Sequence, residues 1–249
     1  MSDNECIYGR NAVREMLTHQ PDRVTKLYIR EHTKGSTIRE IEDLASAGRI
    51  PVQTVPGRKL NDLVGSVNDQ GVVAMISATP YLSLEEWLET IDTADNPVII
   101  ALDEVEDPHN FGAIIRTAAA AGVRGILVPK HRQAPVSGAV MKASAGAAGR
   151  IPVIRAGNLK QSLQMLKDAG FWVCGTSMDA KTRFWDQRYD MPLVLVIGGE
   201  DKGIRKKTRD YCDMFVHIPM QNQLESLNAS VSCALVCYEV LRQRKMKPE

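Results

Sequence analysis

Small hydroxyl and amide side chains gather in one turn near the carboxyl-terminal end of the chain. Ser226, Asn228 and Ser230 lie there, between an apolar run at Met214–Ile218 and a largely apolar segment at Val231–Leu241. The first run predicts a buried strand and the second a helix. Capping of the helix start explains one of these side chains. The remaining polar side chains of this turn indicate a ligand site, because loops at the carboxyl ends of strands in α/β sheets bind ligands.

A second segment that could take part in chemistry is the glycine-rich turn Gly198–Gly203, which carries the carboxyl group of Glu200. The turn follows a predicted strand and precedes a predicted helix, as nucleotide-binding loops do. Its spacing, however, is neither that of a G-x-G-x-x-G fingerprint nor that of a Walker A loop. The residues alone allow two interpretations: a tight turn that needs a positive φ at a glycine, or a bare backbone that a cofactor approaches closely.

Asn110 and Arg116 follow another buried strand, predicted at Val98–Leu102. Asn110 is a predicted N-cap, and six positions advance a helix by about 600°, so the two side chains do not share one face. Arg116 lies within an apolar run, where it must either extend into solvent or meet an anion. Its fork of donors suits a phosphate or a carboxylate, and Glu200 is a candidate partner.

In this order, the three segments resemble the three motifs of the SpoU (TrmH) family of RNA ribose 2′-O-methyltransferases, in the SPOUT superfamily. The Asn and Arg of the first motif are matched by Asn110 and Arg116, and the Gly and Glu of the second by Gly198 and Glu200. The Ser-Leu-Asn-x-Ser of the third is matched by Ser226–Ser230. The resemblance implies five catalytic residues, namely Asn110, Arg116, Glu200, Ser226 and Asn228.

The resemblance, which covers about residues 97–244, also implies that S-adenosylmethionine is the cofactor and that the glycine turn lies against it. Backbone groups near six residues would hold it: Thr176, Gly198, Gly199, Ile218, Met220 and Leu227. Family mechanisms propose that the arginine removes the 2′-OH proton. Since a guanidinium stays protonated in proteins, we expect Arg116 to position the acceptor and stabilise the alkoxide instead.

The segments Ile7–Leu17 and Asn68–Ala74 resemble the extra N-terminal domain of the subgroup that modifies 23S ribosomal RNA. That domain implies an L30e-like fold and RNA capture. The favoured function is therefore 2′-O-methylation of a guanosine in 23S ribosomal RNA. A transfer RNA ribose methyltransferase is the alternative enzyme. A non-catalytic RNA-binding protein is the alternative of another class, against which the intact motif residues speak.

The predicted fold class is α/β, with an L30e-like domain at residues 1–76, an acidic linker at 77–96 and a knotted methyltransferase domain at 97–249. Short apolar strands alternate with helices in the last domain, so its sheet should be parallel and covered on both faces. The resemblance implies a trefoil knot from about residue 193 onward. The expected strands are 24–29, 52–55, 71–77, 98–102, 125–128, 153–154, 171–175, 193–197 and 214–218. The expected helices are 9–19, 36–47, 82–91, 110–121, 137–147, 159–169, 204–211 and 227–243.

The net charge of +1 hides an uneven distribution. Residues 1–76 carry 10 basic and 10 acidic side chains, residues 77–96 carry 5 acidic side chains and no basic one, and residues 97–249 carry 21 basic and 15 acidic side chains. The last part therefore has a net charge of +6, with basic clusters at Lys202–Arg209 and Arg242–Lys247. Such clusters are either solvated helix ends or phosphate contacts, and the resemblance favours RNA.

The sequence contains no run of about 18 apolar residues, so no membrane helix is expected. The acidic start Met1–Glu5 argues against a secretory signal. Five cysteines without C-x-x-C spacing predict neither a disulfide framework nor a structural metal, which fits the cytoplasm. Cys233 and Cys237 read as small buried hydrophobic residues. The resemblance implies a homodimer in which the Asn110–Ala121 helix and the C-terminal helix form the interface.

Overall fold

The computed structural model describes residues 5–77, 81–200, 202–222 and 226–245. Its packing divides the chain into two units. The first comprises Met1–Pro80 with Pro135–Arg150, and the second comprises Tyr81–Ala134 with Ile151–Glu249. The segment from Pro135 to Arg150 groups with the first unit because its helix α6 (Gly138–Ala143) packs against β1 (Glu5–Tyr8).

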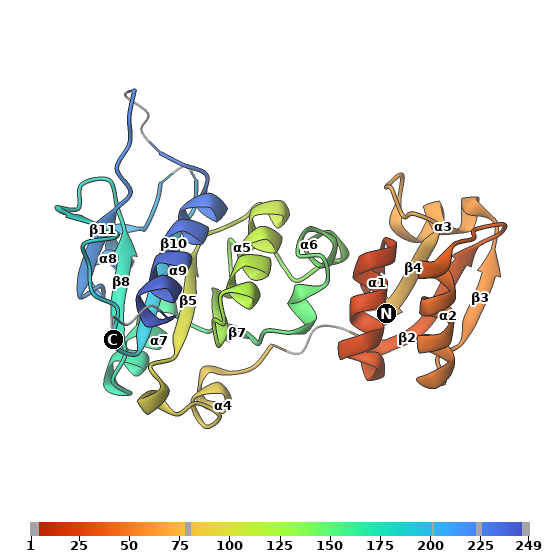
Figure 1. The fold of residues 1–249 in the computed structure, drawn as a ribbon, viewed down its shortest axis with the longest axis horizontal. Helices are drawn as coiled ribbons and strands as arrows, with labels where there is room; N and C mark the ends of the chain where they lie inside the picture. Colours follow the sequence, from red (N-terminus) through yellow and green to blue (C-terminus); the bar gives the residue numbers. More distant parts are fainter. Residues whose placement is uncertain (1–4, 78–80, 201, 223–225, 246–249) are drawn as a thin grey trace. The chain divides into compact units, whose positions relative to one another are not determined.

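The described part of the first unit is a four-stranded sheet with helices (Figure 1). Its strand order is β1-β4-β2-β3, with β4 antiparallel to both neighbours and β2 parallel to β3. The remaining strands are β2 (Val24–Arg30), β3 (Val52–Val55) and β4 (Val72–Ile76). The helices are α1 (Arg10–His19), α2 (Ser36–Ala47) and α3 (Gly57–Val64), with a 3-10 turn at Pro21–Arg23 and another at Ala147–Gly149.

Two elements of this unit, β1 and α3, are absent from the sequence prediction. Strand β1 has four residues and gains its structure by pairing with β4, which lies more than sixty positions away in the chain. Helix α3 begins at Gly57 and buries only Leu60 completely. Tertiary contacts complete both elements: β1 pairs with β4, and Leu60 of α3 packs with Tyr28 and Val73.

The described part of the second unit holds a seven-stranded sheet in the order β7-β6-β5-β10-β8-β11-β9. Every neighbouring pair is parallel, as expected from the alternating strands and helices. All residues of the central strands β5 and β10 are buried. The bounds are β5 (Val98–Asp103), β6 (Gly125–Pro129), β7 (Val153–Ala156), β8 (Trp172–Thr176), β9 (Thr182–Arg183), β10 (Leu193–Gly198) and β11 (Met214–His217).

Strand β10 enters the middle of this sheet late in the chain. It lies between β5 and β8, although both precede it in the sequence. The predicted α/β class is confirmed, and β10 brings a late segment beside the early strand β5. The knot that the family resemblance implies stays a prediction.

In the described part of the second unit, the helices that flank the sheet are α4 (Leu84–Leu88), α5 (Pro108–Ala120), α7 (Leu159–Asp168), α8 (Lys206–Arg209) and α9 (Ala229–Lys245), with a 3-10 turn at Thr93–Asp95. Helices α5 and α9 pack side by side, as Figure 1 shows. Helices α4, α6 and α8 are shorter than the sequence predicts, because the flanking residues form turns and irregular backbone. None of the helices in the described ranges has the length and hydropathy needed to span a bilayer.

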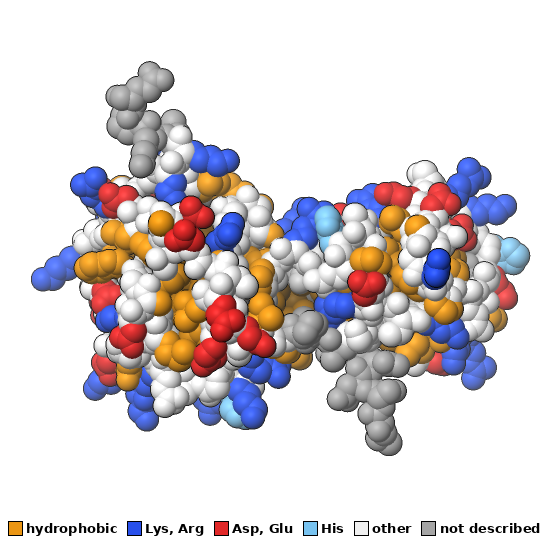
Figure 2. Space-filling view, turned by 90° about the horizontal axis from the view of Figure 1, so that it is seen from below, with side chains coloured by type: hydrophobic (Ala, Val, Ile, Leu, Met, Phe, Trp, Pro, Cys, Tyr) orange, Lys and Arg blue, Asp and Glu red, His pale blue; other side chains and the backbone are white. Residues whose placement is uncertain are grey.

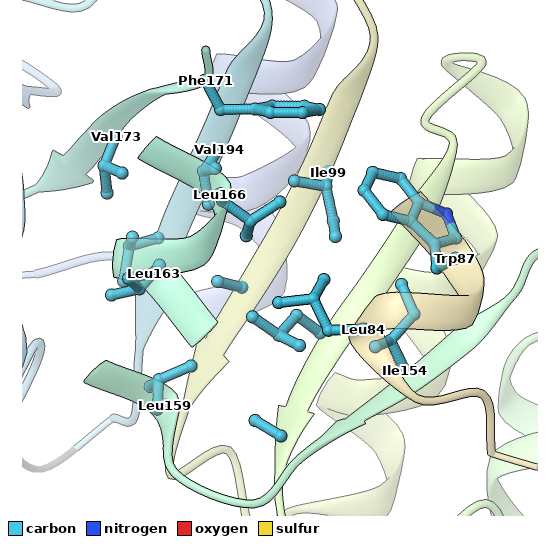
Figure 3. Packing of buried hydrophobic residues seen from close by; sticks show 14 of the residues in the cluster. Leu84, Trp87, Ile99, Ile154, Leu159, Leu163, Leu166, Phe171, Val173 and Val194 are labelled. Atoms are coloured by element: carbon cyan, nitrogen blue, oxygen red, sulfur yellow. The ribbon is translucent and has the colours of Figure 1, made fainter. Parts of the chain in front are cut away.

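The segment predicted as an acidic linker contributes a side chain to the core of the second unit. Trp87 on α4 is fully buried among Ile99, Ile154 and Phe171 (Figure 3). Its indole N–H donates to the backbone oxygen of Arg124 at 3.0 Å. A buried Trp with its N–H satisfied is a strong anchor, so α4 packs as part of this unit.

Candidate functional site

The two central strands of the second unit end at the same edge of the sheet. Gly198, the last residue of β10, pairs with Asp103, the last residue of β5. The segments that follow these strands carry Glu200 and Asn110. The parallel register therefore brings the first two motifs to one place.

Asn110, Glu200 and Asn228 form one hydrogen-bonded cluster. The side-chain amide of Asn110 donates to Glu200 Oε1. The side-chain amide of Asn228 donates to Asn110 Oδ1 at 2.8 Å and to the same Glu200 oxygen at 2.9 Å. Asn110 is buried, whereas Glu200 and Asn228 are exposed. One residue from each of the three motifs thus meets the other two at a solvent-accessible edge.

The remaining oxygen of Asn228 caps α9. Its Oδ1 accepts from Ser230 N at 2.9 Å and from Ser230 Oγ at 2.6 Å. This confirms that one residue of the turn is a helix cap. It also fixes the orientation of the amide, so that the Nδ2 group of Asn228 faces Asn110 and Glu200.

Asn110 is not the N-cap of its helix, contrary to the sequence prediction. The cap is Asp107, whose carboxylate accepts from the backbone N–H of His109 at 2.9 Å. Pro108 occupies the first helical position, where its missing N–H costs nothing. Because the cap is supplied three residues earlier, the side chain of Asn110 is free to bond Glu200.

The glycine turn is compact because its own backbone fills the space where side chains would lie. A Cβ on Gly198 would approach the carbonyl carbon of Gly203 to 2.1 Å, and one on Gly199 would approach the Glu104 oxygen to 2.4 Å. Gly203 has a φ of +58°. The first interpretation, a tight turn, therefore accounts for these glycines, and neither Gly198 nor Gly199 is required by a ligand alone.

A cavity of about 420 Å³ opens beside this turn. All six residues that the resemblance assigns to the cofactor line it, namely Thr176, Gly198, Gly199, Ile218, Met220 and Leu227. Glu200 and Ser226 line it as well. Apolar side chains such as Ile204 and Val216 supply other walls. Its size is that of small-molecule sites, and its lining combines apolar side chains with a larger share of polar backbone and side-chain groups.

Two residues on the rim of this cavity were not predicted. Ser177 and Arg209 line it, and Arg209 donates to Ser177 Oγ at 2.5 Å. The same guanidinium bonds both oxygens of Asp179 at 3.0 Å and lies over the ring of Phe215. The basic run at Lys202–Arg209 could have indicated Arg209 from the sequence. Ser177 lies at the cavity because β8, which it follows, ends beside β10.

Arg205, in the same basic run, is exposed but pairs with a buried carboxylate. Its guanidinium bonds Asp103, which is fully buried, at 2.7 Å, and Glu104 at 2.7 Å. The Asp103 carboxylate raises the pKa of Arg205. This pair ties the end of β5 to the segment after β10. Lys202, Lys206 and Lys207 are the exposed cations of the run without such partners among the described residues.

Arg116 does not pair with Glu200, the candidate partner that the sequence suggested. Glu200 bonds two amides instead. Arg116 is exposed on α5 and has no ion pair within the ranges that the structure describes. The helical spacing from the buried Asn110 explains this outcome, since six positions place the two side chains on different faces. The sequence left two placements open for Arg116, extension into solvent or contact with an anion, and the structure shows the first.

A second cavity, of about 310 Å³, adjoins the first. The two share Glu200 and Lys202, and Asn110 lines the second. Arg132 and four acidic residues complete much of its wall: Asp103, Glu104, Glu106 and Asp107. The cluster around Glu200 therefore stands between two hollows, an arrangement that suits two substrates meeting at one point.

Comparison with known proteins finds two family models on this chain. The SpoU rRNA Methylase family matches residues 97–238, and a model for RNA 2′-O ribose methyltransferase substrate binding matches residues 6–82. The 23S rRNA (guanosine-2′-O-)-methyltransferase RlmB of Pseudomonas putida is 40% identical over 250 residues, which cover 99% of this chain and 100% of that protein. A Staphylococcus aureus protein assigned to the TrmH family of tRNA/rRNA methyltransferases is 41% identical, covering 97% of each chain.

Solved structures share the fold. The SpoU methyltransferase AviRb from Streptomyces viridochromogenes superposes with a TM-score of 0.81 at 24% identity, covering 97% of this chain and 90% of that one. An AdoMet-bound rRNA methyltransferase from Sinorhizobium meliloti gives 0.81 at 24% identity, covering 98% and 88%. The similarity extends over both units of the chain.

Proposed function

This chain belongs to the SpoU RNA methylase family, and we propose that it transfers a methyl group from S-adenosylmethionine to the 2′ oxygen of a guanosine ribose in 23S ribosomal RNA. The observation that carries the proposal is the meeting of Asn110, Glu200 and Asn228 between two cavities. The near full-length identity to an enzyme with that printed activity supports the choice of RNA. A ribosomal RNA substrate implies that the protein acts in the cytoplasm.

The larger cavity fits S-adenosylmethionine. The backbone of the glycine turn, the apolar walls and Thr176 and Ser226 offer the contacts that an adenosine and an amino acid require. When bound, the cofactor supplies a methyl group made electrophilic by its positive sulfur. We assign its binding to Thr176, Gly198, Gly199, Ile218, Met220 and Leu227, with Ser177 and Arg209 at the rim.

We assign the acceptor ribose to the smaller cavity. Transfer requires the 2′ oxygen to be held in line with the methyl group. A carboxylate can accept the proton of a hydroxyl in a hydrogen bond, while amide N–H groups donate to the hydroxyl's lone pairs. The fixed orientation of Asn228 and Asn110 around Glu200 makes this site preorganised, so little reorganisation is needed during the reaction. Ser226, which is exposed at the first cavity, is the fifth residue of the proposed set.

We propose that Arg116 binds the RNA rather than the cluster. Its exposed guanidinium suits a phosphate of the RNA, and since Arg116 lines neither cavity, the alkoxide stabilisation expected of it stays a prediction. The proton then leaves to the phosphate or to water, since guanidinium does not act as a base at neutral pH.

We propose that residues 1–76 capture RNA and that residues 97–249 carry out the chemistry, with 77–96 between them. The substrate-binding family model and the L30e-like resemblance support the first assignment. The position of all five proposed catalytic residues in the second unit supports the other. Deletion of residues 1–76 should leave cofactor binding intact and weaken RNA binding and methylation.

We propose that the protein is a homodimer. Helix α9 packs on α5 but still exposes Val231, Leu235 and Tyr238 at 46%, 39% and 50% of their surfaces. These residues are spaced i, i+4 and i+7, so they form one apolar stripe along the helix. A second copy of the chain would cover it. The family resemblance implies this use of α9.

The test of the proposed function is methylation of purified RNA by the full-length protein. Unmodified 23S ribosomal RNA and a transfer RNA pool are incubated separately with S-adenosylmethionine, and 2′-O-methylated nucleotides are mapped. We expect one guanosine in 23S ribosomal RNA to be modified. Methylation of transfer RNA alone would support the alternative enzyme, and cofactor-independent RNA binding without any methylation would support a non-catalytic protein.

A further inference from the structure

A polar hollow of about 520 Å³ lies in the first unit, apart from every residue assigned to catalysis. Three loops form it: the start of α1, the segment between β2 and α2, and the segment before β4. The side chains of Arg10, Arg30, His32 and Lys34 line it. Asp69 is its only carboxylate among the lining residues, so permanent positive charge exceeds negative charge there.

That single carboxylate is already used inside the protein. Asp69 is buried and accepts from Arg30 through both oxygens, at 2.6 and 2.8 Å, and from Gly71 N at 2.7 Å. It therefore fixes the guanidinium of Arg30 and the loop before β4. Among the lining residues, no carboxylate is then free to neutralise Arg10 or Lys34.

Arg10 is held with its terminal nitrogens open. Its backbone N–H donates to Gln70 Oε1 at 2.9 Å, and its Nε donates to the Gln70 carbonyl at 3.1 Å. Within the described ranges, its two terminal nitrogens, His32 and Lys34 have no hydrogen-bond or ion-pair partner. The Arg10 guanidinium lies against Gly35, where a Cβ would be 3.3 Å from a terminal nitrogen.

The backbone around the hollow adds donors and strain. Helix α1 begins here at Arg10, after its N-cap Gly9, and has no side-chain cap. The Arg10 N–H is taken by Gln70, and the helix dipole favours an anion near the N–H groups that follow it. His32 and Gln70 have φ values of +62° and +53°, which non-glycine residues adopt at a cost. Strain of this kind persists at sites with a function, where the surrounding structure holds it.

We propose that this hollow binds a backbone phosphate of the substrate RNA, so that Arg10 and Lys34 form the RNA-capturing contact of the first unit. The inference rests on the proposed function and locates its RNA contact. Residues 1–76 carry no net charge, and basic and acidic side chains alternate over both units on the face drawn in Figure 2. A local hollow with excess positive charge would therefore let residues 1–76 hold a phosphate although their overall charge is zero.

The test is the salt dependence of RNA binding by the full-length protein. Lys34→Gln removes an exposed, unpaired cation, so the fold should be unaffected. Loss of one phosphate contact should lower the slope of log affinity against log salt by about one and weaken binding about fivefold at 0.15 M salt. The loss should be equal for a 23S ribosomal RNA transcript and a transcript of scrambled sequence, because phosphates carry no sequence information.

Two further variants complete the experiment. Lys34→Arg should retain the wild-type slope. Arg49→Gln removes an exposed cation just beyond the opposite end of the twelve-residue helix α2, about 18 Å away, and should also retain it. A wild-type slope in Lys34→Gln, or an equal fall in Arg49→Gln, would overturn the proposal. If the wild type binds RNA with the expected slope change in Lys34→Gln but methylates no RNA, the proposed function fails and the phosphate site stands.

Discussion

Asn110 and Asn228 are hydrogen-bonded to each other at 2.8 Å, although 118 positions separate them in the chain. Each also donates to the same oxygen of Glu200. The contact joins the start of α5 to the start of α9, two helices that pack along each other (Figure 1). The proposed catalytic cluster and the helix packing therefore meet at this point. The effect of a substitution on the rate can be separated from its effect on stability by the choice of the replacing residue.

Asn228→Ser should slow methyl transfer while preserving the helix. Serine can still cap α9 but cannot donate to Asn110 and Glu200. Loss of one preorganised donor typically costs on the order of 10²–10³ in rate. Single-turnover methylation should show this loss, with S-adenosylmethionine affinity near that of the wild type. Asn228→Ala should lose the same rate and also about 1 kcal/mol of stability, because it removes the cap as well. A rate in Asn228→Ser equal to that of the wild type would exclude the amide from the mechanism.

Arg116→Ala should be slow in methyl transfer but unchanged in thermal stability. The side chain is exposed and makes no ion pair with the described residues, so its removal leaves no buried group unpaired. We expect a rate loss on the order of 10² and a normal cofactor affinity. Arg116→Lys should remain impaired, because lysine keeps the charge but loses the fork.

Arg124→Ala is the matched control for Arg116, since it removes another exposed arginine close to the end of α5. It should methylate RNA at the wild-type rate. Equal rates for the two alanine variants would contradict a specific role for Arg116.

Gly198→Ala should destabilise the protein as well as weaken cofactor binding. The added Cβ would meet the backbone of Gly203 and Ile204 at 2.1 and 2.3 Å, and backbone cannot move aside cheaply. We expect a loss of about 1–3 kcal/mol, typical of overpacking, measured by urea denaturation. Gly157→Ala is the control, because nothing lies within 4 Å of its Cβ position. An unchanged urea midpoint in Gly198→Ala would show that the turn relaxes more easily than its contacts imply.

Leu235→Asp should convert the proposed dimer into a monomer. The substitution places a charge in the middle of the exposed stripe of α9, where an interface would have to desolvate it. Sedimentation should give about twice the chain mass for the wild type and one chain mass for the variant. Val52→Asp places the same charge at an exposed apolar residue of the first unit and should leave the wild-type mass unchanged. A wild-type protein that sediments as a monomer at micromolar concentration would remove the dimer from the proposal.

Folding stability should fall above pH 9 in part because of Cys174. Burial raises the pKa of this thiol from 9.0 to about 12, with Cys212 adding to the effect. The folded protein therefore keeps a proton that the unfolded chain loses. The contribution is fully present below pH 9 and is lost between pH 9 and 12, with a loss on the order of 1 kcal/mol by pH 10. Urea denaturation at pH 8 and pH 10 should show a smaller loss in Cys174→Ala than in the wild type, and an equal loss would contradict the assignment.

The sequence by itself determined the alternating strands and helices of the second unit, since β5 and β10 are continuous apolar runs and the helices are long enough to show their period. Resemblance of its motifs to a known family further pointed to Asn110, Glu200 and Asn228, and to six residues that prove to line one cavity. Each of these signals is local: a run, a spacing or a short ordered motif.

Only the tertiary structure decided which of these side chains meet. The insertion of β10 between β5 and β8 brings Glu200 to Asn110 rather than to Arg116. The pairing of Arg205 with the buried Asp103, and the approach of the Glu104 backbone to Gly199, likewise depend on segments distant in the chain. Sequence patterns report how one segment distributes its side chains, whereas hydrogen-bond partners and excluded volume are set by the strand order, which no single segment encodes.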